Sequence, residues 1–73
     1  MRASNATVDK LRERFPQGAR VELEWMEDFQ APPIGTRGTV MGVDDMGTIH
    51  VRWDNGSGLG VVYGEDRCRR VEE

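Results

Sequence analysis

The 73-residue chain carries 13 acidic and 10 basic side chains, a formal net charge of −3 at pH 7. This length allows one domain, and the negative balance gives no general attraction to nucleic acid or anionic membranes. A single cysteine, Cys68, excludes an internal disulfide and favours a reducing compartment. No run approaches the roughly 20 apolar residues of a membrane span, and no signal-peptide pattern opens the chain. We therefore expect a cytoplasmic protein with no membrane contact.

The first predicted element is a short helix over about residues 7–15, which opens a single domain over residues 7–72 and follows a flexible N-terminus over residues 1–6. Three apolar residues have the spacing of one helical stripe: Val8, Leu11 and Phe15. Either Thr7 or Asn5 can be the N-cap, because a short side-chain oxygen accepts a backbone N–H. The helix ends before a proline, which disfavours helical geometry at the preceding residue.

A first strand is predicted after Gly18, where the apolar period changes from helical to two. Its apolar residues alternate with charged ones and are expected on the buried face: Val21, Leu23 and Trp25. A long connection over residues 26–34 follows. Pro32 and Pro33 exclude this segment from the centre of a sheet, so we expect a loop.

A second strand is predicted over Arg37–Val43. Its alternation slips, because Val40 and Val43 cannot share one face of a regular strand. Gly42 lies between them and indicates a bulge or a sharp bend. Residues 44–47, Asp-Asp-Met-Gly, predict a tight turn, since Asp side chains bond the local backbone and glycine adopts positive φ.

A third strand is predicted over residues 49–53, with Ile49, Val51 and Trp53 facing inward. The two tryptophans are therefore assigned to the core rather than to an aromatic cage for a cationic side chain. The following Asn55-Gly56 is the strongest short hairpin signal.

A fourth strand is predicted over residues 59–63, and a turn over residues 64–66 leads into a fifth strand that carries Cys68 and Val71 into the core. Five short strands, a long first loop and a bent second strand predict a small closed barrel.

Several motifs together are distinctive. They are Gly-Thr-Arg-Gly-Thr-Val at residues 35–40, Ile-His-Val-Arg-Trp-Asp-Asn-Gly-Ser at residues 49–57 and Tyr-Gly-Glu-Asp at residues 63–66. Over roughly residues 8–71 the chain resembles a small bacterial family known only as domain of unknown function 4314. The resemblance implies an SH3-like fold and a frequent home in mobile elements and phage-like regions, with no catalytic residues and no ligand. The fold class is therefore mostly β, an SH3-like five-stranded small barrel with a short N-terminal α-helix.

The sequence favours neither catalysis nor metal binding. Its one histidine, His50, is predicted on the strand face opposite to Cys68, and one Cys with one His cannot form a zinc site alone. The acidic pairs at residues 27–28 and 44–45 lack the spacing of a calcium loop. We expect a protein that is not an enzyme and uses no cofactor or metal.

The predicted function is binding of an unknown protein or peptide between two loops, residues 26–34 and 54–58. Phe29 lies among acids in the Pro-rich loop, and is either a lid over the barrel end or an exposed contact residue. An acidic rim with an aromatic side chain suits a basic or Pro-containing peptide. The candidate surface comprises Glu27, Asp28, Phe29, Asp54, Ser57 and Tyr63.

The alternative function is a KOW-like nucleic-acid-associated module, because Gly-Thr-x-Gly-Thr-Val is similar to KOW segments. Five arginines would then contact phosphates: Arg37, Arg52, Arg67, Arg69 and Arg70. The negative net charge makes this the second choice. A third hypothesis is a structural domain in a larger phage or mobile-element assembly, but we expect a monomer.

Overall fold

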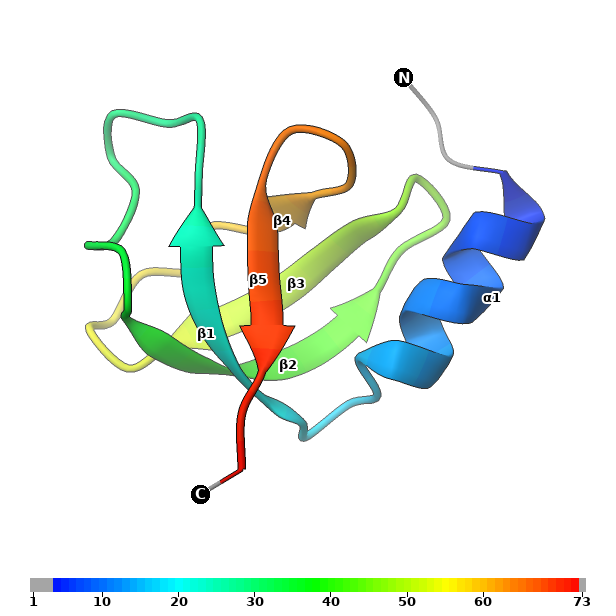
Figure 1. Cartoon of the computed structure of the whole chain (residues 1–73), viewed down its shortest axis with the longest axis horizontal. Helices are drawn as coiled ribbons and strands as arrows, with labels where there is room; N and C mark the ends of the chain where they lie inside the picture. Colours follow the sequence, from blue (N-terminus) through cyan, green and yellow to red (C-terminus); the bar gives the residue numbers. More distant parts are fainter. Residues whose placement is uncertain (1–3, 73) are drawn as a thin grey trace.

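The computed structural model describes residues 4–72, which form one antiparallel five-stranded sheet and one short helix (Figure 1). The elements in chain order are α1 (Asn5–Arg14), β1 (Arg20–Trp25), β2 (Arg37–Val43), β3 (Thr48–Trp53), β4 (Val61–Val62) and β5 (Arg67–Arg70). The strand order in the sheet is β4-β3-β2-β1-β5. The prediction of a mostly β chain with a short N-terminal helix is confirmed.

The predicted closure of the sheet into a barrel is wrong. β4 and β5 are the two edges, and within residues 4–72 no strand pairing joins them. Val62 gives the reason, because its carbonyl accepts the N–H groups of Glu65 and Asp66 at 3.1 and 2.8 Å. Its own N–H donates to Asp66 Oδ2 at 2.9 Å. The turn after β4 uses these backbone groups, and β4 has two residues instead of the span predicted over residues 59–63.

The helix begins earlier than predicted, because the N-cap is Ser4 and not Thr7 or Asn5. Ser4 Oγ accepts the N–H of Thr7 at 3.2 Å. Residues 4–6 therefore belong to the helix and its cap, whereas residues 1–3 of the predicted flexible N-terminus lie outside the described residues. The predicted apolar stripe is confirmed, and its three residues are buried: Val8, Leu11 and Phe15.

Two strand irregularities shape the sheet. The bulge predicted at Gly42 is confirmed, because the register between β2 and β3 shifts between Val40 and Gly42. A second shift, between Leu23 and Trp25, occurs where β1 pairs with β5. The extra residue in β1 turns Trp25 outward, to 47% exposure, and Met26 enters the core instead. The prediction that Trp25 is buried is therefore wrong.

The core lies on the inner face of the curved sheet and contains residues of all five strands, while α1 at one end adds Val8 and Leu11 (Figure 1). Trp53 is among its most buried side chains, at 1% exposure. The Trp53 indole N–H donates to the carbonyl of Leu59 at 2.8 Å, which provides the partner that a buried indole needs. Cys68 is buried as predicted, but Val71 follows β5 and is only half-buried. Gly38 lies so close to β3 that an added Cβ would be 2.8 Å from the carbonyl oxygen of Arg52.

Candidate functional site

The loop between β1 and β2 is fastened at its start by Asp66, which lies in the turn before β5. Asp66 Oδ1 accepts the N–H of Glu27 at 2.9 Å, and Oδ2 accepts the N–H of Val62 at the same distance. Asp66 is only 9% exposed, and a carboxylate in such a position is stable only when its oxygens are hydrogen-bonded. One side chain therefore holds the loop against β4.

The next residues of the loop form a tight turn that presents Phe29 to solvent. Asp28 Oδ1 accepts the N–H of Gln30 at 2.8 Å, and the Asp28 carbonyl accepts the N–H of Ala31 at 2.9 Å. A short acidic side chain bonded to the backbone two residues on is typical of such turns. Phe29 is 97% exposed at this turn. The lid interpretation is therefore wrong, and the structure places Phe29 as an exposed residue.

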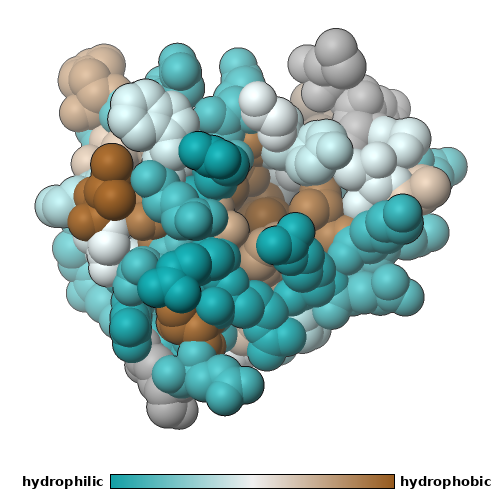
Figure 2. All heavy atoms as spheres, viewed as in Figure 1, coloured by the Kyte–Doolittle hydropathy of each residue, from teal (hydrophilic) through white to brown (hydrophobic). Residues whose placement is uncertain are grey.

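Two further large apolar side chains flank this turn. Trp25 at the end of β1 and Ile34 at the far end of the loop are 47% and 64% exposed. Figure 2 shows brown side chains at the surface on the left of the view, where Figure 1 places the loop between β1 and β2. Single exposed apolar residues are ordinary, but several large ones within ten residues of the chain, at the end of β1 and in the loop that follows, are typical of an interaction surface. We call Trp25, Phe29 and Ile34 the apolar loop residues.

A groove of about 470 Å³ lies between the start of this loop, β3 and the segment before β4. Its lining residues are Met26, Glu27, Asp28, Thr48, His50, Gly58, Leu59, Gly60, Val62, Glu65 and Asp66. Asp66 uses both oxygens to hold backbone N–H groups, as described above. Glu27, Asp28 and Glu65 are exposed and add three further carboxylates. We call this the acidic groove, and its charge favours a basic side chain as its occupant.

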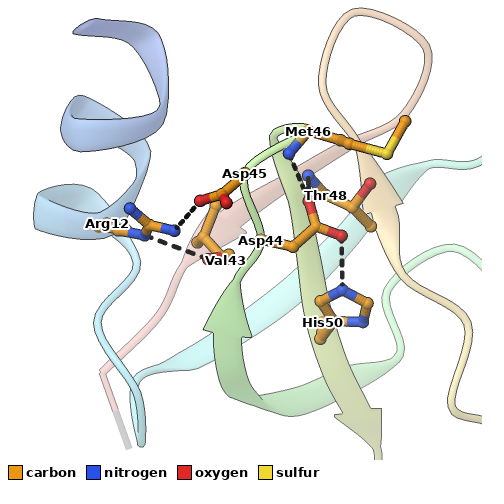
Figure 3. A network of polar contacts seen from close by, with 7 residues as sticks. All are labelled: Arg12, Val43, Asp44, Asp45, Met46, Thr48 and His50. Atoms are coloured by element: carbon orange, nitrogen blue, oxygen red, sulfur yellow. Dashed lines mark hydrogen bonds and ion pairs between the residues drawn. The ribbon is translucent and has the colours of Figure 1, made fainter. Parts of the chain in front are cut away.

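The turn between β2 and β3 positions His50 at this groove (Figure 3). Asp44 Oδ1 accepts the N–H groups of Met46 and Thr48 at 2.9 and 3.0 Å. Asp44 Oδ2 lies 2.9 Å from His50 Nε2. These contacts hold the pKa of Asp44 below its ordinary value. The hydrogen bond from the Thr48 N–H has the largest effect, and those from His50 and the Met46 N–H have smaller ones. The interpretation of Asp44 as a turn-forming residue is confirmed.

Asp45 serves the fold in a different way, because it binds the helix (Figure 3). Arg12 Nη2 is 3.0 Å from Asp45 Oδ1, and Arg12 Nε donates to the carbonyl of Val43 at 3.1 Å.

Among residues 4–72, no group of three or more His, Cys, Asp or Glu side chains is arranged to hold a metal ion.

The other predicted site residues lie elsewhere. Asp54 binds Arg20 through both carboxylate oxygens, at 2.8 and 2.5 Å, and this contact lowers the pKa of Asp54. Ser57 Oγ accepts the N–H of Leu59 within the loop after β3. Tyr63 is exposed and lines a separate cavity beside α1. The structure therefore brings together three of the predicted residues, the three consecutive residues of the β1–β2 loop.

Sequence reasoning missed Asp66 and Ile34. The sequence could have indicated Ile34 as an exposed residue, since it is apolar and lies directly after two prolines in a polar loop. No sequence pattern indicated the role of Asp66, because its partner Glu27 is 39 residues away in the chain.

These observations define a small β-rich domain with one apolar and acidic loop surface. A family model described as Domain of unknown function (DUF4314) matches residues 4–71, so the chain belongs to this family. Searches of curated proteins and of solved structures found no match. Among the described residues, no helix has the length and apolar character to cross a membrane.

Proposed function

We propose that this domain is a non-catalytic protein- or peptide-interaction module of SH3-like type. Support for the SH3-like assignment comes from the five short antiparallel strands, the long loop after β1 and the bend at Gly42 in β2. Unlike a closed barrel, this sheet has two unpaired edge strands, β4 and β5. The interaction itself is supported by the β1–β2 loop.

The observation that carries the proposal is Phe29, which is 97% exposed and directly follows Glu27 and Asp28, two residues that line the acidic groove. Burying a side chain of this size lowers the free energy by about 1.5–3 kcal/mol. Folding does not bury Phe29, so this free energy is available for binding a partner. The ligand we propose is a basic, Pro-containing peptide segment. Its Lys or Arg enters the acidic groove, and its proline packs on the apolar loop residues.

The test is a selection of displayed random peptides on the wild-type chain. We expect the enriched sequences to combine Lys or Arg with Pro. The variant Glu27→Lys/Asp28→Asn/Phe29→Ala then loses at least tenfold in affinity for them. Asp28→Asn removes the charge but keeps the side-chain oxygen that accepts the Gln30 N–H.

The matched control carries the same charge changes, and replaces another exposed apolar residue by Ala, at positions away from the loop in α1 and the β2–β3 turn: Asp9→Asn, Glu13→Lys and Met46→Ala. The control variant should bind the selected peptides as the wild type does. If both variants lose affinity equally, the effect comes from net charge and not from this surface, and the proposal is wrong.

The alternative, a nucleic-acid-associated module, is less well supported by the arginines. Arg37 Nε and Arg69 Nη2 lie 3.3 and 2.9 Å from the two oxygens of Glu22. Their charge is thereby partly neutralised, which leaves less for phosphates. Titration with short duplex RNA and DNA at low salt tests this function, since phosphate binding weakens steeply with salt.

The mobile-element context, the monomeric state and the cytoplasmic location stay predictions.

A further inference from the structure

The sheet has an open edge along β5, on the side away from β1. Val71, directly after β5, donates its N–H to the carbonyl of Arg20 at 3.0 Å. The backbone groups of an antiparallel strand alternate between its two sides, so those of Cys68 and Arg70 point away from β1. In the part of the chain that the structure describes, no further strand pairs with this side of β5. Such an edge is a template for another strand.

A cavity of about 380 Å³ lies beside this edge, between β5 and α1. Figure 2 shows brown atoms set back in the middle of the molecule, where Figure 1 shows β2 and β3 behind the space between β5 and α1. Its apolar lining comes from both elements and from the inner face of the sheet: Leu11, Phe15, Ile49, Val61 and Cys68. An apolar cavity of about 150 Å³ can hold benzene, so this one has room for a large apolar side chain.

The charges at the rim favour an acidic partner. Arg14 and Arg67 line the cavity, and neither forms an ion pair with another described residue. The Arg14 guanidinium lies over the Phe15 ring, 5.4 Å from its centroid, a contact that leaves its positive charge without an acidic partner. Glu24 and Asp66 are the acidic lining residues, but both Asp66 oxygens already bind backbone N–H groups. Arg70 adds a further positive charge along β5. The charge at this edge that is not bound in ion pairs or by backbone N–H groups is therefore mainly positive.

We propose that β5 pairs with an extended acidic segment of a partner protein. The segment adds a strand to the open edge, bonds the backbone groups of Cys68 and Arg70, and places one large apolar side chain in the cavity. Its carboxylates meet Arg14 and Arg67. This β-strand addition uses a different surface from the acidic groove, with Asp66 as the one residue that lines both.

The test uses the full chain labelled with ¹⁵N and three synthetic peptides. The first has a central Phe flanked by Val and Glu, the second replaces Phe by Ala, and the third replaces Glu by Lys. At saturation we expect the first peptide to slow hydrogen exchange of the Cys68 and Arg70 amides at least tenfold, and to slow alkylation of the Cys68 thiol. The second should bind at least tenfold more weakly, and the third should give no protection.

The variant Arg14→Glu/Arg67→Glu should lose at least tenfold in affinity for the first peptide. Its control, Lys10→Glu/Arg52→Glu, changes one exposed helical and one exposed strand residue outside the cavity lining and should bind normally. Protection that rises with protein concentration without peptide would identify a second copy as the occupant and overturn the proposal. Binding of benzene, with no peptide protecting either amide, would show a small-molecule cavity and overturn it too. Shifts confined to residues 27–34 would leave the loop proposal standing and refute this one.

Discussion

Glu27 and Asp66, 39 residues apart in the chain, are joined by a 2.9 Å hydrogen bond from the Glu27 N–H to Asp66 Oδ1. The second oxygen of Asp66 binds the N–H of Val62, so one carboxylate links the β1–β2 loop to the end of β4. Glu27 and Val62 both line the acidic groove, so this side chain holds two parts of its lining together. The hydrogen bonds of Asp66 that stabilise the fold therefore also position the candidate site.

Asp66→Ala should destabilise the domain by about 1–3 kcal/mol, because it leaves two partly buried backbone donors without an acceptor. Urea unfolding followed by tryptophan fluorescence measures the loss. The control is Glu65→Ala, which removes the neighbouring exposed carboxylate of the same groove and should stay within about 0.5 kcal/mol of wild type. Equal losses in the two variants would show that Asp66 does not hold the loop.

Gly38→Ala should cost roughly 1–3 kcal/mol, because the new methyl group overpacks the β2–β3 contact. An added Cβ would meet Val51 Cγ1 at 2.6 Å, the Arg52 carbonyl oxygen at 2.8 Å and Trp53 Cε3 at 2.9 Å. Gly58→Ala is the control, since nothing lies within 4 Å of its Cβ and its φ is not positive. Thermal unfolding should show the Gly58 variant as stable as wild type or slightly more so. A Gly38 variant of unchanged stability would contradict the close strand approach.

Arg12→Ala should destabilise the domain more than Asp45→Asn. The Asp45 variant loses an exposed ion pair, worth about 0–1 kcal/mol, whereas the Arg12 variant also loses the hydrogen bond to the Val43 carbonyl. High salt should shrink the effect of Asp45→Asn and leave most of the difference between the two variants. Urea unfolding at low and high salt measures both. Equal effects at each salt concentration would mean that the Val43 contact contributes nothing.

Cys68 should make stability fall at high pH. Burial, with a smaller effect of Glu24, raises the pKa of the Cys68 thiol from 9.0 to about 11, and Arg14 opposes the rise. The folded state therefore holds the proton more tightly than the unfolded chain. This contribution is fully present below pH 9 and is lost as the pH rises from 9 to about 11. The stability difference between wild type and Cys68→Ala should decline across that window, and a constant difference would contradict the burial of this thiol.

Local patterns predicted the parts of the fold that depend on neighbours in the chain. The bend at Gly42 was predictable because the alternation of β2 breaks within the strand itself. The exposure of Trp25 was not, because the β1 irregularity appears only in its pairing with β5, where Trp25 meets Arg67. The open edge of the sheet likewise depends on the hydrogen bonds between Val62 and Asp66.

The residues of the candidate site also fall into two groups, those that the local sequence predicts and those whose role depends on a distant partner. Phe29 was predictable as a residue with no place in the core, and Glu27 and Asp28 adjoin it in the chain. Asp54 was predicted as part of the binding surface, but it forms an ion pair with Arg20, 34 residues away. A residue whose role is set by a distant partner has no signal in its own segment.

The most direct test of the proposed function is chemical-shift mapping of the ¹⁵N-labelled chain with a peptide from the display selection. The account predicts that the largest shifts lie at residues 27–34, which include Phe29 and Ile34, and at Glu65 in the lining of the acidic groove. Saturation should require at least tenfold more peptide for Glu27→Lys/Asp28→Asn/Phe29→Ala than for wild type. Largest shifts on the outer arginines Arg37, Arg52 and Arg69, or an unchanged affinity of that variant, would contradict it.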